Sequence, residues 1–186
     1  MKPSSPSAIL LVDGYNVIGA SPGLKRTLSH HGLTAARDEF IEVLISYSAY
    51  QGYETQVVFD ACYRGNPGHH EVVTPHLAVR YTDYRQTADT FIEKACAQFR
   101  NDVRKLTHRL IVATSDRAQQ LTVVGYGAEC ISARQLLNEV EAMKRQVQRR
   151  QKPKRQTSSR FLAKSLDPVA QERLNQLRFG LRLEGK

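Results

Sequence analysis

Closely spaced cysteines are missing from this sequence. Its three cysteines, Cys62, Cys96 and Cys130, lie far apart, and none of them forms a CxxC pair. An odd number of widely spaced cysteines is typical of reduced thiols in a cytosolic protein. We therefore expect neither a disulfide framework nor a cysteine-bound zinc ion.

Long apolar segments are also missing. No apolar run approaches the roughly 20 residues that a membrane-spanning helix needs. Residues 1–7 lead straight into a strand-like run, which leaves no room for the hydrophobic region of a secretory signal. We expect a cytoplasmic protein that makes no contact with a membrane.

Motifs of several enzyme classes cannot be found. There is no Walker A sequence, and the six histidines do not have HExxH spacing. Asp13-Gly14-Tyr15 lacks the second Asp of a haloacid-dehalogenase-like phosphatase. The glycines of 125–128 precede a strand and lack the third glycine of a dinucleotide loop.

Positive charge is scarce in the body of the chain and concentrated at its end. The net charge is +9, but residues 1–143 carry 14 Lys and Arg against 15 Asp and Glu. Residues 144–186 carry 13 basic residues against 3 acidic ones. A basic block of this kind favours a polyanion such as RNA or the ribosome. A solvated linker is the alternative.

The basic block supplies the residues that we predict to bind substrate. They are Arg149, Arg150, Lys152, Lys154 and Arg155. Within 144–186, Asp167-Pro168 can begin a helix and Gly180 can end it, so the extension is expected to be helical in part.

Strand and helix patterns alternate along residues 8–143. Apolar runs predict strands at 9–12, 54–60, 77–81, 110–114 and 128–131. Helical spacing predicts helices at 35–50, 88–105, 117–124 and 133–150. The glycine-containing segment 14–33 is expected to be a loop or a short turn of helix, and the segment 62–71 is expected to be a flexible loop. This alternation indicates a doubly wound α/β fold with a mainly parallel sheet.

Carboxylates follow three of the predicted strands. Asp13 and Asp60 end the first two, and Asp116 follows the strand at 110–114. Asp89 opens a helix, with Glu93 one turn later on the same face. Because parallel strands gather their carboxyl ends at one edge, these acids can share a cleft. A divalent cation is the usual remedy for such crowded negative charge.

Each of these acids also has a purely structural explanation. Asp13 can simply end a strand, and Asp116 can cap the helix that follows it. Asp89 can be a partner of the helix dipole. Asp60 can hold the loop after its strand. These alternatives stay open at the level of single residues.

Taken together, the motifs resemble those of the NYN-domain, PIN-like nucleases. The motifs are Asp13-Gly14-Tyr15-Asn16, Val58-Phe59-Asp60-Ala61, Thr87-Ala88-Asp89 with Ile92-Glu93, and Ala113-Thr114-Ser115-Asp116. The chain is most similar to the YacP-type group of bacterial endoribonucleases that act with the ribosome. The resemblance covers residues 8–143 and extends to Leu166-Asp167-Pro168 and to 177–180.

The resemblance implies a PIN-like α/β/α sandwich at 8–143, a basic extension at 144–186 and a Mg²⁺ or Mn²⁺ cofactor. It assigns catalytic or ligand roles to Asp13, Asp89 and Asp116, with Asn16 and Ser115 as polar helpers. Glu93 and Asp60 are further candidate metal ligands.

The activity expected is metal-dependent hydrolysis of RNA, with mRNA on the ribosome as substrate. Two alternatives remain: a non-catalytic RNA- or ribosome-binding module with a vestigial acidic cleft, and a structure-specific DNA nuclease.

Overall fold

The computed structural model describes residues 8–60 and 68–151. By its internal contacts the chain divides into two compact units, Met1–Val147 and Gln148–Lys186. All of the described strands belong to the first unit. Cys62 and the expected C-terminal helix of 167–180 lie outside the described residues. The domain boundary between 143 and 144 stays a prediction.

One sheet forms the centre of the fold. Its strands are β1 (Ala8–Asp13), β2 (Glu54–Phe59), β3 (His69–Thr74), β4 (Leu77–Tyr81), β5 (Arg109–Ala113) and β6 (Glu129–Ile131). Their order in space is β3-β4-β2-β1-β5-β6. Only the β3–β4 pair is antiparallel among the described strands. The mainly parallel sheet predicted from the sequence is confirmed.

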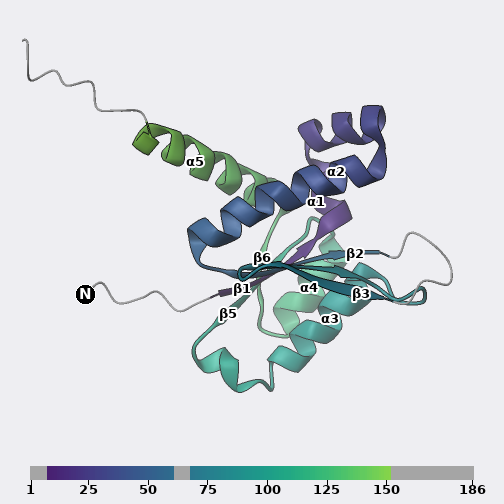
Figure 1. Ribbon diagram of the computed structural model, residues 1–186. Helices are drawn as coiled ribbons and strands as arrows, with labels where there is room; N and C mark the ends of the chain where they lie inside the picture. Colours follow the sequence, from purple (N-terminus) through teal and green to yellow (C-terminus); the bar gives the residue numbers. More distant parts are fainter. Residues whose placement is uncertain (1–7, 61–67, 152–186) are drawn as a thin grey trace, which may run out of the picture. The chain divides into compact units, whose positions relative to one another are not determined.

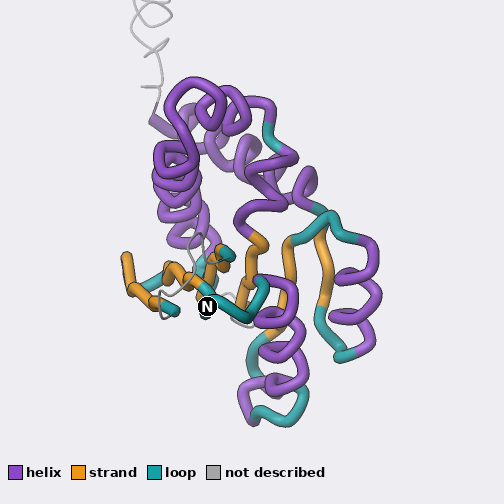
Figure 2. Tube along the Cα trace, turned by 90° about the vertical axis from the view of Figure 1, so that its right-hand side faces the viewer, coloured by secondary structure: helices purple, strands orange, loops and turns teal. Residues whose placement is uncertain are grey.

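Helices cover both faces of this sheet. They are α1 (Gly14–Ala20), α2 (Pro22–Gln51), α3 (Ala88–Phe99), α4 (Arg117–Gly125) and α5 (Ala133–Gln151), with a 3₁₀ turn, η1 (Val103–Leu106). α1, α2 and α5 lie on one side of the strands, and α3 and α4 lie on the other (Figure 1). The view at a right angle shows the same helical layers flanking the strands (Figure 2). None of the described helices is long and apolar enough to cross a membrane.

The alternation of strand side chains decides which residues face each layer. In β1, Leu10 and Val12 pack into the core under α2, whereas Leu11 packs into the core under α3. Asp13 continues the Leu11 series, because successive side chains point to opposite faces. The acid that ends β1 is therefore directed toward the α3 and α4 side of the sheet.

Two segments contain more regular structure than the loop or short helical turn expected for the first and the loop expected for the second. Residues 14–33 form α1 and the first part of α2, because Asp13 caps α1 and Ser21 caps α2 with a proline at its first turn. Gly32 interrupts α2 with a φ of 85°, a conformation that glycine adopts without strain. The helix expected from residue 35 is present, and Gly52 ends it.

β3 was not predicted from the sequence, and the segment 62–71 that was expected to be a loop includes its first residues. Its residues are mostly exposed, so its sequence carries no buried apolar pattern. Pairing with β4 produces the strand. At α3 the prediction was too long: the helix ends at Phe99 and not near residue 105, because Asp102 caps η1 instead.

Candidate active site

The strand order of the sheet reverses at β1. From β1 the chain proceeds to β2 on one side, while β5 pairs with the other side of β1. Open α/β sheets bind their ligands at such a switch point, beyond the carboxyl ends of the strands. Asp13 lies at the end of β1, and Thr114, Ser115 and Asp116 follow β5.

Asp13 is the most enclosed of the candidate acids. It is 8% exposed. One of its carboxylate oxygens accepts a hydrogen bond from the backbone N–H of Asn16 at 3.1 Å, which caps α1. Asp13 therefore caps α1 as well as ending β1, and this leaves carboxylate capacity for a second role.

Asp89 and Asp60 come together at the start of α3. Thr87 caps this helix by accepting from the N–H of Thr90 at 3.1 Å. Asp60, just after β2, accepts a hydrogen bond from the backbone N–H of Ala88. This contact attaches the first turn of α3, and hence Asp89, to the carboxyl end of β2.

Asp116 and its neighbours form the turn between β5 and α4. Asp116 caps α4 by accepting from the N–H of Gln119 at 3.0 Å. Ser115 donates its backbone N–H to Oδ1 of Asn16 at 2.8 Å. Its hydroxyl oxygen accepts from the N–H of Ala133 at 3.0 Å. Asn16 and Ser115 thus connect the turn after β1 to the turn after β5.

The acids are close enough to influence one another's ionisation. Burial, together with the negative charges of Asp89, Asp60 and Asp116, raises the pKa of Asp13 to about 6 against the lowering effect of the Asn16 hydrogen bond. The pKa of Asp89 is raised by burial and by its neighbours Asp116, Asp60 and Glu93. Four carboxylates therefore gather at the switch point.

Glu93 is the one predicted ligand whose charge does not affect the pKa of Asp13. Its negative charge raises the pKa of Asp89, whereas the charges that raise the pKa of Asp13 are those of the other three aspartates. It lies one turn farther along α3, where it also contributes to the raised pKa of the buried Cys96 thiol.

The donor chemistry of the cluster fits a hard cation. Carboxylate oxygens are the ligands that Mg²⁺ and Mn²⁺ prefer, and crowded unneutralised carboxylates favour cation binding. Within residues 8–60 and 68–151, however, no three His, Cys, Asp or Glu side chains have the close arrangement of a preformed metal site. The acids are neighbours, but in this arrangement no three of these side chains are close enough together to bind one cation.

The YacP-like NYN domain family model matches residues 10–179 of this chain. The chain belongs to the YacP-like NYN domain family. YacP of Bacillus subtilis strain 168 is 43% identical to it over 143 residues, which are 76% of this chain and 80% of that protein.

Solved structures agree with this assignment. A crystal structure of a point mutant of Rae1 (YacP) from Bacillus subtilis superimposes with a TM-score of 0.65 at 34% identity, covering 91% of this chain and 99% of that one. A second Rae1 (YacP) structure gives 0.61 at 35% identity, covering 92% and 95%. The resemblance inferred from the motifs is confirmed, and membership of the family is consistent with a nuclease.

One residue of this YacP-like site was missed from the sequence. Gln119 is 2% exposed, and its Nε2 donates to Oδ1 of Asp89 at 2.7 Å. The available signal was its spacing, because Asp116 and Gln119 have the separation of a capping box. That pattern alone predicts a contact within α4 and not one with α3.

The predicted substrate-binding residues of the YacP-like chain are only partly described. Arg149 and Arg150 are exposed in the last turn of α5, where positive charge complements the helix dipole. Lys152, Lys154 and Arg155 lie outside the described residues.

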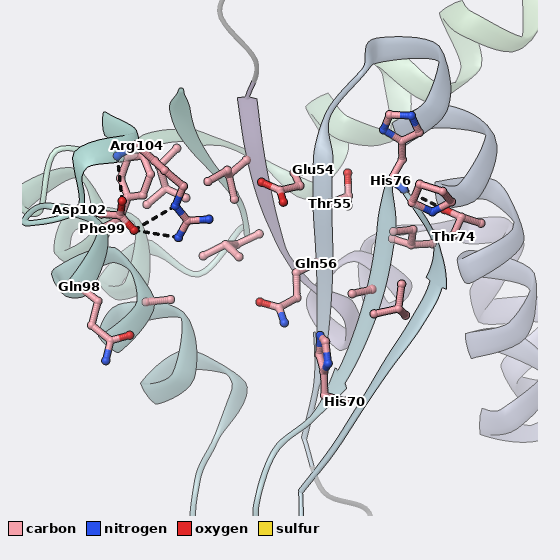
Figure 3. Close-up of a pocket in the computed structure, with 18 residues that line it drawn as sticks. Glu54, Thr55, Gln56, His70, Thr74, His76, Gln98, Phe99, Asp102 and Arg104 are labelled. Atoms are coloured by element: carbon pink, nitrogen blue, oxygen red, sulfur yellow. Dashed lines mark hydrogen bonds and ion pairs between the residues drawn. The ribbon is translucent and has the colours of Figure 1, made fainter. Parts of the chain in front are cut away.

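A pocket of about 440 Å³ is separate from the acids. It is lined near the amino ends of the strands by Ile9, Glu54, Leu77 and Leu110, and none of the four clustered aspartates lines it. Asp102 and Arg104 lie on one side of the pocket, and Gln56 and His70 lie on the other side (Figure 3). Its position at the opposite edge of the sheet removes it from the candidate active site.

Proposed function

We propose that this protein is a Mg²⁺- or Mn²⁺-dependent endoribonuclease that hydrolyses RNA phosphodiester bonds, with mRNA on the ribosome as its substrate and the cytoplasm as its location. The observation that carries the proposal is the gathering of Asp13, Asp60, Asp89 and Asp116 at the switch point of the sheet, with Asp13 buried. Family membership supports nuclease chemistry at this position.

Asp13, Asp89 and Asp116 would hold the cation, with Asp60 and Glu93 farther from its centre. When bound, the cation supplies a Lewis acid that activates water and neutralises charge on the scissile phosphate. Mg²⁺ usually keeps several of its waters and uses one or two carboxylates directly. A cluster without three joint ligands therefore remains suitable for it.

The remaining contacts of the cluster position these acids. The Asn16–Ser115 hydrogen bond holds the turns after β1 and β5 together, so Asp13 and Asp116 keep their separation. Asp89 lies in the first turn of α3, and Asp116 caps α4. The N-termini of both helices thus lie at the cluster, where their dipoles favour an anionic phosphate group.

The basic extension would bind the polyanion. Arg149 and Arg150, together with Lys152, Lys154 and Arg155, supply the charge that the near-neutral body lacks. They would hold RNA phosphates of the transcript or of the ribosome while the acid cluster acts.

A cleavage assay tests the proposal directly. Labelled RNA and DNA are incubated with the protein, free and on translating ribosomes, in Mg²⁺, Mn²⁺ or EDTA. We expect RNA cleavage that EDTA abolishes and that Asp89→Asn and Asp116→Asn each reduce by orders of magnitude. Asp102→Asn is the matched control, because Asp102 lies beside Arg104 at the other edge of the sheet.

Each alternative outcome has a definite meaning. Cleavage that survives EDTA or both aspartate substitutions would contradict the acid cluster as the catalytic site. RNA binding without any cleavage would identify a binding module. Preferential cutting of DNA would identify a DNA nuclease.

A further inference from the structure

Gln119 is a buried polar residue inside the acid cluster. Its side chain leaves α4 and contacts α3, where Nε2 donates to Oδ1 of Asp89 at 2.7 Å. Its backbone N–H donates to Oδ1 of Asp116 at 3.0 Å. One residue therefore contacts two of the acids, each from a different element.

The orientation of its amide follows from chemistry. An ionised carboxylate can only accept hydrogen bonds, so the nitrogen of the amide must face Asp89. The carbonyl oxygen then points to the other side. This Oε1 atom is buried and has no hydrogen-bond partner. A buried acceptor without a partner is unfavourable, and most such groups in proteins have one.

The usual partner of a glutamine at this position is already occupied. In a capping box, the side chain three residues after the cap reaches back to the N–H of the cap residue. Here the N–H of Asp116 donates instead to Oγ1 of Thr114 at 3.1 Å. Gln119 is thus directed away from its own helix terminus and into the cluster.

We propose that Gln119 is a positioning residue for cation binding in this site. Its Nε2 holds Asp89 in place against the repulsion of the neighbouring aspartates. Its Oε1, which is turned away from Asp89 and has no partner, is left to accept a hydrogen bond from a water that enters with the cation. This inference rests on the proposed metal-dependent function, and groups that orient metal ligands in this manner tune metal affinity.

Measurement of Mn²⁺ binding tests the positioning role of Gln119 independently of catalysis. Mn²⁺ is titrated into wild type and Gln119→Met and followed by electron paramagnetic resonance. Methionine keeps the size of the side chain and removes both amide groups. We expect Mn²⁺ affinity to fall about 10–100-fold, the range found for residues that orient metal ligands.

Gln120→Met is the matched control. Gln120 is the next residue of α4, and its Nε2 donates to the backbone oxygen of Thr114 at 2.8 Å and to none of the acids. We expect its Mn²⁺ affinity to equal that of wild type. RNA cleavage by Gln119→Met should recover as Mn²⁺ is raised, which a merely misfolded site would not allow.

A second variant covers the case in which Gln119→Met fails to fold. Gln119→Glu replaces the donor to Asp89 with another carboxylate oxygen. We expect a lower melting temperature than wild type in EDTA and a larger increase on addition of Mn²⁺. An equal or smaller increase would overturn the proposal.

Failure of this inference can be separated from failure of the proposed function. If wild type binds Mn²⁺ and both Gln119 variants bind it equally well, the positioning role is wrong and the metal site stands. If wild type shows no Mn²⁺ binding at the cluster, both proposals are overturned.

Discussion

Asp13 combines burial with the proximity of three other aspartates, and both effects favour its protonated form. Its pKa is about 6, against an ordinary value of 3.8. Below about pH 4 the folded and unfolded chains both carry this proton. As the pH rises toward 6, the unfolded chain releases the proton first, so the free energy of unfolding falls and stays lower above pH 6.

We therefore expect Asp13→Asn to stabilise the metal-free protein near neutral pH. The gain should be up to about 3 kcal/mol at about pH 7 and should vanish at about pH 3. Asparagine also caps helices well, so α1 should keep its start. Urea denaturation in EDTA at the two pH values measures the difference, and the same variant should lose RNA cleavage.

The opposite result would contradict the electrostatic picture of the site. If Asp13→Asn were equally destabilised at both pH values, Asp13 would contribute as a structural hydrogen-bond acceptor alone.

The Asn16–Ser115 hydrogen bond is the second residue-scale feature with a measurable consequence. Asn16→Ala removes the acceptor of the Ser115 N–H. We expect a loss of about 1 kcal/mol in the free energy of unfolding. Cleavage should fall by more than this loss of stability explains, because the turns that carry Asp13 and Asp116 are no longer tied. Measurement of kcat at saturating metal, well below the melting temperature, checks this.

At the scale of elements, the start of α1 is packed tightly against β2. A methyl group on Gly14 would overlap the ring of Phe59, which is fully buried. The Phe59 ring also contacts Tyr15, with ring centroids 5.1 Å apart. The absence of a side chain at residue 14 thus lets the turn after Asp13 lie against the neighbouring strand.

This packing predicts a coupled pair of substitutions. We expect Gly14→Ala to cost about 1–3 kcal/mol of stability through overpacking. Combining it with Phe59→Leu should cost less than the sum of the two single changes, with a coupling of about 0.5–3 kcal/mol. Denaturant titration of the four proteins gives the coupling, and strict additivity would contradict the contact.

At the scale of the whole molecule, the distribution of charge is the dominant feature. A near-neutral body is joined to an extension with 13 basic residues. Binding of RNA by such a chain releases counterions, and its affinity should fall about 10³–10⁵-fold between about 50 and about 200 mM salt if 6–10 phosphates are contacted.

Arg149→Gln combined with Arg150→Gln should reduce the slope of log affinity against log salt by about 2, which is about 1 for each lost phosphate contact. The control pair is Arg104→Gln with Arg109→Gln, which removes the same charge from residues paired with Asp102 and Glu129. Fluorescence anisotropy with labelled RNA measures both slopes. Equal slopes in all three proteins would contradict the role of the extension.

Local sequence patterns were sufficient to predict the structure wherever a residue's environment depends on its neighbours in the sequence. β1 and β5 were predicted because they are buried on both faces and read as unbroken apolar runs. Asp116 was predicted as a cap because capping is a contact across three residues. β3 was missed because its exposed side chains depend on pairing with β4 for their strand conformation.

The sequence by itself determined the fold class, the family motifs and which carboxylates follow the strands, because these depend on short-range periodicity and on residue type. The tertiary structure alone decided how near those carboxylates lie to one another, since their separation depends on strand order and on contacts such as Asp60 with Ala88. It also decided the place of Gln119, whose side chain contacts a residue 30 positions away on another helix. Local sequence cannot specify such a contact, because the packing of whole elements creates it.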